Sequence, residues 1–194
     1  MSKIVIAYHS GYGHTAKVAE HVAKGARDAG AEVSLVKVDT IDETGWALLD
    51  GADAIIFGSP TYMGSVSAPF KTFQDATAQR WYQQVWRGKL AAGFSVSGSL
   101  SGDKLASLLA MVIFSQQHGM IWTGTGVMQN EQAKGDEMLS KDALNRIGSY
   151  VGLMAQANND APENTITAGD LKTAELFGAN VAAVAKRLGP APKA

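Results

Sequence analysis

The fold is decided near the N-terminus by the stretch Ile4-Val5-Ile6-Ala7-Tyr8-His9-Ser10-Gly11-Tyr12-Gly13-His14-Thr15. It begins with a continuous apolar run, which is typical of a strand covered on both faces. A short loop rich in glycine and hydroxyl groups follows. From 15 to 29 the apolar residues recur at helical spacing, and Gly30 supplies a stop signal. The stretch therefore predicts a buried strand, a loop and a helix in immediate succession.

The same alternation continues along the rest of the chain. Further strands are predicted at 33–38, 54–57, 90–96 and 119–127, and helices at 43–50, 68–79, 104–117 and 167–188. Buried strands that alternate with helices form parallel sheets with right-handed crossovers. We therefore expect one α/β domain over residues 1–194, built on a doubly wound, five-stranded parallel sheet.

One segment departs from this pattern. Residues 130–165 are polar and poorly periodic, with a short helix predicted around 139–147. A long excursion of this kind usually forms a functional cover, an interface or a disordered segment. We expect it to be an insertion in the single domain or a cover over it.

Composition excludes several classes of function. Of the 194 residues, 46% are hydrophobic and 18% are charged, which suits a globular domain with one core. The net charge of −1 offers no basic face, so no nucleic-acid partner is expected. Because the chain has no cysteine, disulfides, thiolate chemistry and cysteine-ligated clusters are excluded. Any redox chemistry must therefore belong to a bound cofactor.

No targeting segment, membrane span or metal site is expected. The N-terminus turns polar too quickly for a secretory signal. The longest apolar stretch, 105–114, is interrupted by Ser107 and falls short of the roughly 20 residues that a membrane helix needs. His9, His14 and His21 do not have the spacing of metal ligands. The default expectation is a cytoplasmic protein.

A phosphate site is predicted in the loop after the first strand, which comprises Ser10, Gly11, Tyr12, Gly13, His14 and Thr15. Ligands of doubly wound sheets bind outside the carboxyl ends of the strands. Hydroxyl groups, exposed backbone amides and the positive end of the following helix suit an anion. Two other interpretations stay open. The loop could be a simple helix cap, or Gly11-x-Gly13-x-x-Ala16 could be a dinucleotide fingerprint, with Asp39 as its ribose-binding acid.

The loops after the third and fourth predicted strands are also rich in glycine and hydroxyl groups. They contain Pro60, Thr61, Tyr62, Met63 and Gly64, and then Val96, Ser97, Gly98, Ser99, Leu100 and Ser101. The side chains of Tyr62 and Met63 offer a flat or soft surface to an aromatic ring. A ligand with a phosphate, a polyol and a flat ring would use all three loops, and FMN has these parts. We therefore expect FMN as the cofactor.

Several blocks of the sequence resemble the flavodoxin-like NAD(P)H:quinone oxidoreductases of the WrbA type. They are distributed over most of residues 4–120 and comprise Ser10-x-Tyr12-Gly13-His14, Asp53-Ala54-Ile55-Ile56-Phe57-Gly58-Ser59-Pro60-Thr61, Lys71-Thr72-Phe73-x-Asp75-x-Thr77, Trp81, Gly88-Lys89-Leu90-Ala91, the loop at Ser97 and His118-Gly119-Met120. The resemblance implies a flavodoxin-like sheet of strand order 2-1-3-4-5, with FMN as cofactor and NADH or NADPH as co-substrate. It also implies a quinone or similar small-molecule acceptor and assembly as a homodimer or homotetramer.

The resemblance further implies roles for individual residues. The loops at 10–15, 60–64 and 96–101 would contact FMN, and Tyr12 would also line the nicotinamide site. His118 matches a histidine that contacts FMN, and Trp81 matches an aromatic wall of the substrate pocket, so we expect both to be catalytic. From the residues alone, His118 would be a helix C-terminal residue and Trp81 peripheral packing.

The sequence departs from the family at Tyr62-Met63, where a basic–aromatic pair is common, and at Leu100, where glycine is usual.

Two functions fit an FMN site of this kind. The first is a two-electron flavoenzyme, in which NAD(P)H and then a quinone use the same slot in a ping-pong sequence. The alternative is a flavodoxin-type electron carrier that binds FMN without oxidising NAD(P)H itself. The near-zero net charge disfavours the carrier, since electron carriers usually dock through a strongly charged face. A dinucleotide-dependent dehydrogenase without flavin is a third interpretation.

Overall fold

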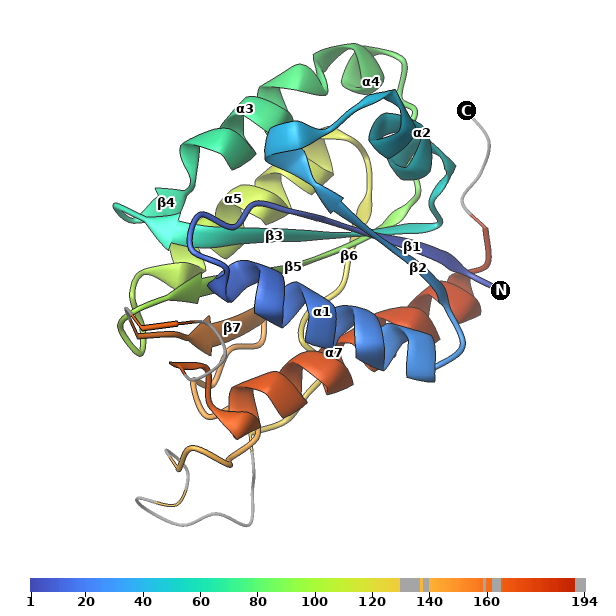
Figure 1. Ribbon diagram of the computed structural model, residues 1–194. Coiled ribbons are helices and arrows are strands. Elements are labelled where there is room, and N and C mark those ends of the chain that lie inside the picture. The colour runs from blue at the N-terminus through green and yellow to red at the C-terminus, as the bar shows by residue number, and fades with distance from the viewer. Residues whose placement is uncertain (130–136, 138–139, 159, 162–164, 191–194) are drawn as a thin grey trace.

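A central sheet separates two layers of helices (Figure 1). The computed structural model describes residues 1–129, 137, 140–158, 160–161 and 165–190. The strands are β1 (Lys3–Tyr8), β2 (Glu32–Lys37), β3 (Ala54–Tyr62), β4 (Ser65–Val66), β5 (Leu90–Ser97), β6 (Ile121–Trp122) and β7 (Leu153–Gln156). The α-helices are α1 (His14–Asp28), α2 (Glu43–Gly51), α3 (Ala68–Ala76), α4 (Ala78–Tyr82), α5 (Lys104–Gln117) and α7 (Ala168–Leu188). None of the described helices is long and apolar enough to cross a membrane.

The sheet has the order β2-β1-β3-β5-β6, and all these strands run parallel. The short β4 is an antiparallel hairpin partner of β3, and β7 pairs in parallel with β5. Without the hairpin strand this is the predicted order 2-1-3-4-5, so the doubly wound topology is confirmed. The strand order changes direction between β1 and β3, and ligands of such sheets bind at the carboxyl ends of the strands flanking that point.

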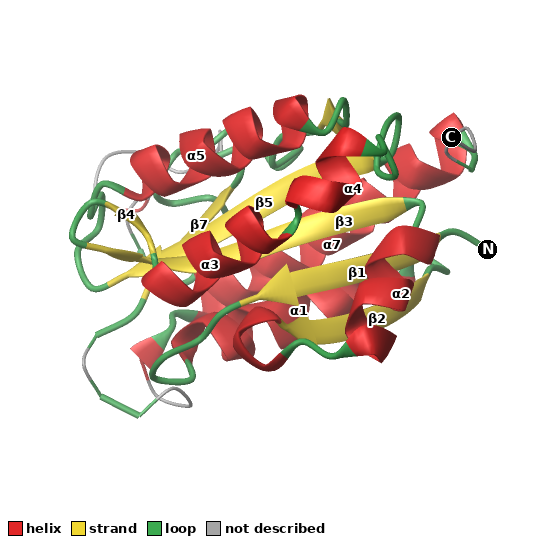
Figure 2. Cartoon of the chain, turned by 90° about the horizontal axis from the view of Figure 1, so that it is seen from above, coloured by secondary structure: helices red, strands yellow, loops and turns green. Residues whose placement is uncertain are grey.

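Side chains of β1 alternate between the two helical layers. Ile4, Ile6 and Tyr8 are buried with the apolar residues of α1 and α7, whereas Val5 and Ala7 are buried with those of α2, α3 and α5. Seen from above, α3, α4 and α5 lie over one face of the sheet and α1 and α7 over the other (Figure 2). Because both faces are covered, the central strands are continuous apolar runs.

The helices α1 and α7 can pack closely because each places a glycine at their crossing. A Cβ at Gly25 would collide with the backbone of Glu175, and one at Gly178 would collide with the backbone of Val22. His21 Nδ1 also lies 3.1 Å from Glu175 Oε1. These contacts fix α7 on α1. The apolar spacing of the sequence predicted both helices.

The fifth strand position is shared by two short strands, which corrects the single strand expected at 119–127. β6 lies beside the start of β5, and β7 lies beside its end, where Phe94 pairs with Leu153 and Ser97 with Gln156. The expected insertion at 130–165 therefore contributes a strand to the sheet itself.

Glycines explain why the first of these strands is so short. Gly124 lies so close to the carbonyl oxygen of Tyr150 that a Cβ would collide with it, and Gly126 has a φ of +65°. A strand favours neither feature, so the chain leaves the sheet after Trp122. Residues 140–147 form turns instead of the helix expected at 139–147, and Leu139 lies outside the described residues.

The helix expected at 68–79 is divided at Thr77 into α3 and α4. The Thr77 hydroxyl donates to Gln74 O at 2.7 Å and lies 2.9 Å from His118 Nε2. This side chain therefore joins the end of α3 to the end of α5.

His118 is a core residue at the C-terminal end of α5. Its side chain is buried, with its ring centroid 4.6 Å from that of Trp86 and 4.9 Å from that of Phe114. Since the Thr77 hydroxyl donates elsewhere, it accepts from His118 Nε2, which leaves Nδ1 as the unprotonated nitrogen. The buried His118 Nδ1 has no hydrogen-bond partner within the residues described. Burial lowers the pKa of His118 from 6.5 to about 4, so the imidazole is neutral at pH 7.

This burial predicts a loss of stability in acid. Between pH 6.5 and pH 4 the unfolded chain binds a proton at His118 and the folded chain does not, so unfolding becomes easier as the pH falls. The contribution of His118 to the free energy of unfolding should drop by about 2.5 kcal/mol between pH 7 and pH 4.5. The measurement is urea unfolding of the wild type and His118→Gln at both pH values. If both proteins lose the same free energy, His118 is not the buried titrating group.

Candidate functional site

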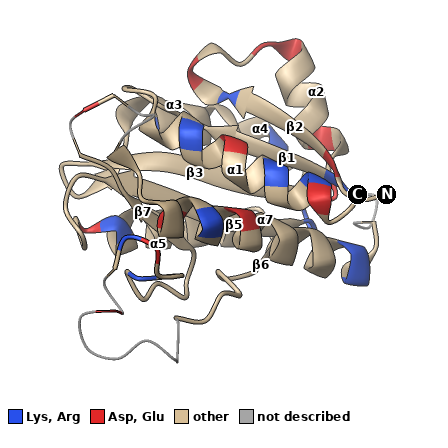
Figure 3. Cartoon of the chain, turned by 60° about the horizontal axis from the view of Figure 1, so that its bottom comes forward, with Lys and Arg blue, Asp and Glu red and all other residues tan. Residues whose placement is uncertain are grey.

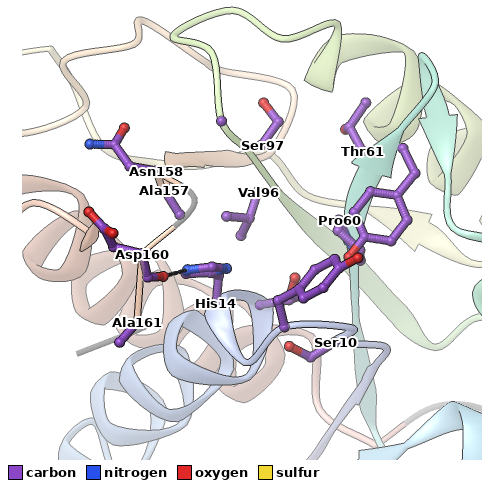
Figure 4. A pocket seen from close by; sticks show the side chains of 14 residues that line it. Ser10, His14, Pro60, Thr61, Val96, Ser97, Ala157, Asn158, Asp160 and Ala161 are labelled. Atoms are coloured by element: carbon purple, nitrogen blue, oxygen red, sulfur yellow. Dashed lines mark hydrogen bonds between the residues drawn. The ribbon is translucent and has the colours of Figure 1, made fainter. Parts of the chain in front are cut away.

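A cleft of about 700 Å³ opens at the carboxyl edge of the sheet (Figure 4). Three of its walls are the loop between β1 and α1, the end of β3 and the end of β5, and the fourth is the segment that follows β7. The predicted site residues that line it are Ser10, Tyr12, His14, Thr15, Pro60, Thr61, Tyr62, Val96, Ser97 and Gly98. The structure therefore brings the three predicted loops together around one space.

The start of α1 has the features of an anion site. Gly13 occupies the N-cap position with a φ of 89° and has no side chain with which to cap the helix itself. The Ser10 hydroxyl accepts a hydrogen bond from the Ala16 amide at 3.1 Å, which leaves the amides of His14 and Thr15 without partners inside the helix. The first turn of α1 carries no acidic residue. The cap interpretation is thus correct for Ser10 and still leaves donors for a phosphate.

Two tyrosines flank the mouth of the cleft. The rings of Tyr12 and Tyr62 meet edge to face, with centroids 6.3 Å apart. Tyr12 is 76% exposed, whereas Tyr62 is 39% exposed. A Cβ at Gly11 would lie 2.7 Å from the Tyr62 hydroxyl, so glycine at this position lets the first loop approach the second. Burial raises the pKa of Tyr62, so its phenol is neutral at pH 7. The pair offers flat, neutral surface to a planar ligand.

Hydroxyl groups hold the ends of β3 and β5 in register beneath the cleft. Thr61 Oγ1 lies 2.8 Å from Ser95 Oγ and 2.7 Å from Ser107 Oγ of α5, and Ser95 Oγ donates to Ser59 O at 2.8 Å. All four residues are buried. A fully partnered buried network makes this part of the site rigid.

The loop after β5 is built over a buried lysine that sequence reasoning missed. Lys104 Nζ donates to Ser97 Oγ at 2.7 Å, to Ser99 O at 2.8 Å and to Leu100 O at 3.0 Å. Burial lowers the pKa of Lys104 from 10.5 to about 8. The one signal in the sequence is a lysine that opens the apolar run of α5.

The fourth wall was also missed, because the fifth strand was expected at 119–127. Ala157, Asn158, Asp160 and Ala161 follow β7 and line the cleft. His14 Nε2 lies 2.8 Å from the carbonyl oxygen of Asp160, so this wall meets the first loop (Figure 4).

A buried ion pair anchors this fourth wall. Arg146 Nε lies 2.9 Å from Asp170 Oδ1, and both side chains are buried. Asp170 Oδ2 accepts from the backbone amide of Gln156 at 2.9 Å, and the side-chain amide of Gln156 donates to Gly98 O at 2.9 Å. The end of β7 is therefore fixed to α7 and to the loop after β5.

Other predicted residues lie near the cleft without lining it. Gly11 and Gly13 belong to the first loop, and Met63 and Gly64 form the turn between β3 and β4. Met63 is fully exposed. Ser99, Leu100 and Ser101 belong to the loop over Lys104.

His118 and Trp81 are not part of this cleft. His118 immediately precedes Gly119, which pairs with Gly88 before the start of β5, and Trp81 lies on α4 in the chain that leads there. Both residues therefore lie at the amino edge of the sheet, opposite the cleft. α5 runs back from the cleft along the sheet and carries His118 to its far end, so the expected contacts of His118 with FMN and of Trp81 with substrate stay predictions.

The described residues of the cleft suit an organic ligand rather than a metal ion. Within the described part of the chain, no group of three or more His, Asp or Glu side chains is placed to hold a metal ion. The polar groups of the cleft are hydroxyls, amides and carbonyls, together with the side chains of His14 and Asp160. This donor set suits a neutral or anionic organic ligand.

Comparisons with known proteins agree with this geometry. Residues 4–134 match the family model described as NADPH-dependent FMN reductase. The chain is 42% identical to Flavodoxin FldP of Pseudomonas aeruginosa, over 97% of this chain and 99% of that protein. It is 33% identical to an NAD(P)H dehydrogenase (quinone) of Archaeoglobus fulgidus, over 97% of this chain and 100% of that protein.

A solved structure gives the same result. The flavodoxin, WrbA-like protein from Agrobacterium tumefaciens is 40% identical and superposes with a TM-score of 0.77, over 97% of this chain and 100% of that chain. The resemblance found in the sequence is therefore confirmed, and with it the flavodoxin-like fold. The chain belongs to the NADPH-dependent FMN reductase family.

Proposed function

We propose that this protein binds FMN in the cleft at the carboxyl edge and uses it to reduce quinones or similar acceptors with NADH or NADPH. The observation that carries the proposal is the convergence of three loops around one space, each suited to a different part of FMN. The names of the relatives agree, since the Archaeoglobus protein is called an NAD(P)H dehydrogenase (quinone).

The residues present fit FMN part by part. The helix start at His14 and the Ser10 hydroxyl suit the phosphate, because their donors are neutral and no carboxylate stands in the first turn. The loop at 97–98, where Gly98 is exposed, suits the polar edge of the ring, and Tyr62 supplies flat surface. When bound, FMN accepts a hydride from the nicotinamide and delivers two electrons to the acceptor.

The protein's own contribution is binding, orientation and access. The buried hydroxyls of Thr61, Ser95 and Ser107 hold the ends of β3 and β5 in place when the ring of FMN binds. Tyr12 stands exposed at the mouth, where a nicotinamide or a quinone would approach. The mouth flanked by Tyr12 and Tyr62 can serve the donor and the acceptor in turn, which is the basis of the ping-pong proposal. Assembly as a homo-oligomer and a cytoplasmic location stay predictions.

One observation favours the alternative of an electron carrier, since the relative that is 42% identical is named a flavodoxin. Charge argues against it. Basic and acidic residues are interspersed along α1 (Figure 3), and the net charge is −1. A carrier that docks electrostatically needs a larger field of one sign.

Direct reduction by a nicotinamide separates the two functions. In the absence of oxygen, NADH or NADPH added to FMN-loaded protein should bleach the flavin absorbance, and a quinone added next should restore it. Steady-state rates at varied donor and acceptor should give parallel double-reciprocal lines. Absence of bleaching with both nicotinamides would establish the carrier instead, and intersecting lines would rule out the ping-pong order.

Replacement of Ser10 tests the phosphate site. Ser10→Ala removes a hydroxyl that orders the helix start, and a lost hydrogen bond of about 1.4 kcal/mol raises the Kd for FMN about tenfold. Riboflavin lacks the phosphate, so its Kd should not change. Fluorescence titration measures both, and Thr72→Ala, which removes an exposed hydroxyl of α3, is the matched control. An equal loss for both ligands would place the phosphate elsewhere.

Replacement of Tyr12 tests access of the nicotinamide. Tyr12→Ala should slow anaerobic bleaching by NAD(P)H about fivefold to tenfold, because a stacking surface worth about 1 kcal/mol is lost. The Kd for FMN should change less than the bleaching rate. Stopped-flow absorbance gives the rate, and Tyr150→Ala, at another exposed tyrosine, is the control. An unchanged bleaching rate would remove Tyr12 from the nicotinamide site.

A further inference from the structure

Lys104 is a buried lysine directly behind one wall of the cleft. Its side chain is 0% exposed, and all three oxygens that accept from Nζ belong to the loop at 97–100. One of these oxygens is Ser97 Oγ, and Ser97 lines the cleft. The ammonium is therefore separated from the cleft by a side chain that it contacts.

Among the residues that the structure describes, no carboxylate contacts this ammonium. Each of its three acceptors is a neutral oxygen. The charged groups that act on it are Asp170 of α7 and Arg146, and these pair with each other at 2.9 Å. Their effects on Lys104 oppose one another. A net positive charge thus remains behind the wall.

The position of Lys104 in its helix makes this charge costly. It is the first residue of α5, and a cation at a helix N-terminus meets the positive end of the helix dipole. Burial adds a desolvation cost. Lys89, a second buried lysine, donates instead to Leu49 O and Asp50 O at the carboxyl end of α2, where the dipole favours a cation. Helix electrostatics therefore explain Lys89 and do not explain Lys104.

Hydride transfer to bound FMN would place a negative charge near the positive charge of Lys104. A hydride adds two electrons and one proton to the oxidised ring of FMN, and the nicotinamide leaves as its oxidised cation. Near neutral pH the ring then carries one more negative charge than before. A positive charge close to a cleft of low dielectric lowers the free energy of that anion.

We propose that Lys104 is a positioning residue for bound FMN. It shapes the loop at 97–100 through its three hydrogen bonds, and its charge, held behind Ser97, favours the reduced ring over the oxidised ring. This inference rests on the proposed function, because it requires FMN in the cleft.

The midpoint potential of bound FMN tests the inference. In Lys104→Met, the ratio of the affinity for reduced FMN to the affinity for oxidised FMN should be about tenfold lower than in the wild type. For a two-electron couple this lowers the midpoint potential by about 30 mV. Lys104→Arg keeps the charge and should stay within about 10 mV of the wild type, which is about a twofold change. Equilibration with a reference dye measures the potential of each FMN-loaded protein.

Lys89→Met is the matched control. It also removes a buried ammonium that donates to backbone carbonyls, but at the other end of the sheet. Its midpoint potential should equal that of the wild type. An equal drop in both methionine variants would assign the effect to general loss of buried charge and overturn the proposal.

A comparison across pH keeps the test decisive if Lys104→Met does not fold. The pKa of Lys104 is lowered to about 8, so the wild type loses this charge between pH 7 and pH 9.5, while an arginine keeps it. The potential of the wild type should therefore fall by up to about 30 mV relative to Lys104→Arg over that range. A constant difference between the two proteins would overturn the proposal.

The remaining outcomes separate the inference from the proposed function. If Lys104→Met binds FMN more weakly in both redox states and its potential is unchanged, Lys104 only shapes the loop and the proposed charge effect is wrong. If the wild type binds FMN and no Lys104 variant differs from it, the inference alone fails. If the wild type does not bind FMN, the proposed function fails as well.

Discussion

The buried ion pair between Arg146 and Asp170 is the interaction on which the shape of the cleft depends. Asp170, at the start of α7, also holds the backbone of Gln156, and Gln156 in turn holds the loop at Gly98. Removing one member of such a pair leaves an unpaired buried charge, which costs about 3–5 kcal/mol. The walls are therefore fixed before a ligand binds. Ordering them on binding costs less free energy than it would in a flexible cleft.

Polar and apolar burial are divided between the two edges of the sheet. At the carboxyl edge, the hydroxyls of Thr61, Ser95 and Ser107 satisfy one another beneath the cleft. At the amino edge, aromatic rings enclose the neutral His118. The aromatic rings around His118 provide apolar packing. Beneath the cleft, buried hydroxyl groups replace such packing with a rigid set of hydrogen-bond donors and acceptors.

Local patterns were enough to predict most of the fold and three walls of the site. Apolar runs and helical spacing located β1, β3, β5, α1, α5 and α7, and parallel topology then placed the three loops together. The fourth wall was missed because Gly124 and Gly126 turn the chain out of the sheet. The place beside the end of β5 is then filled by β7, at 153–156. Lys104 could not be predicted, because lysine is normally exposed. His118 could be placed only by the direction of α5, which a match of short motifs does not reveal.

The proposed function requires FMN to lie in the cleft with its phosphate at the start of α1. A crystal structure of the protein grown with FMN tests this most directly. We expect phosphate oxygens within hydrogen-bonding distance of the amides at 14–15, and the ring between the 61–62 and 97–98 walls. FMN bound at any other surface, or an empty cleft in crystals grown with saturating FMN, would contradict it.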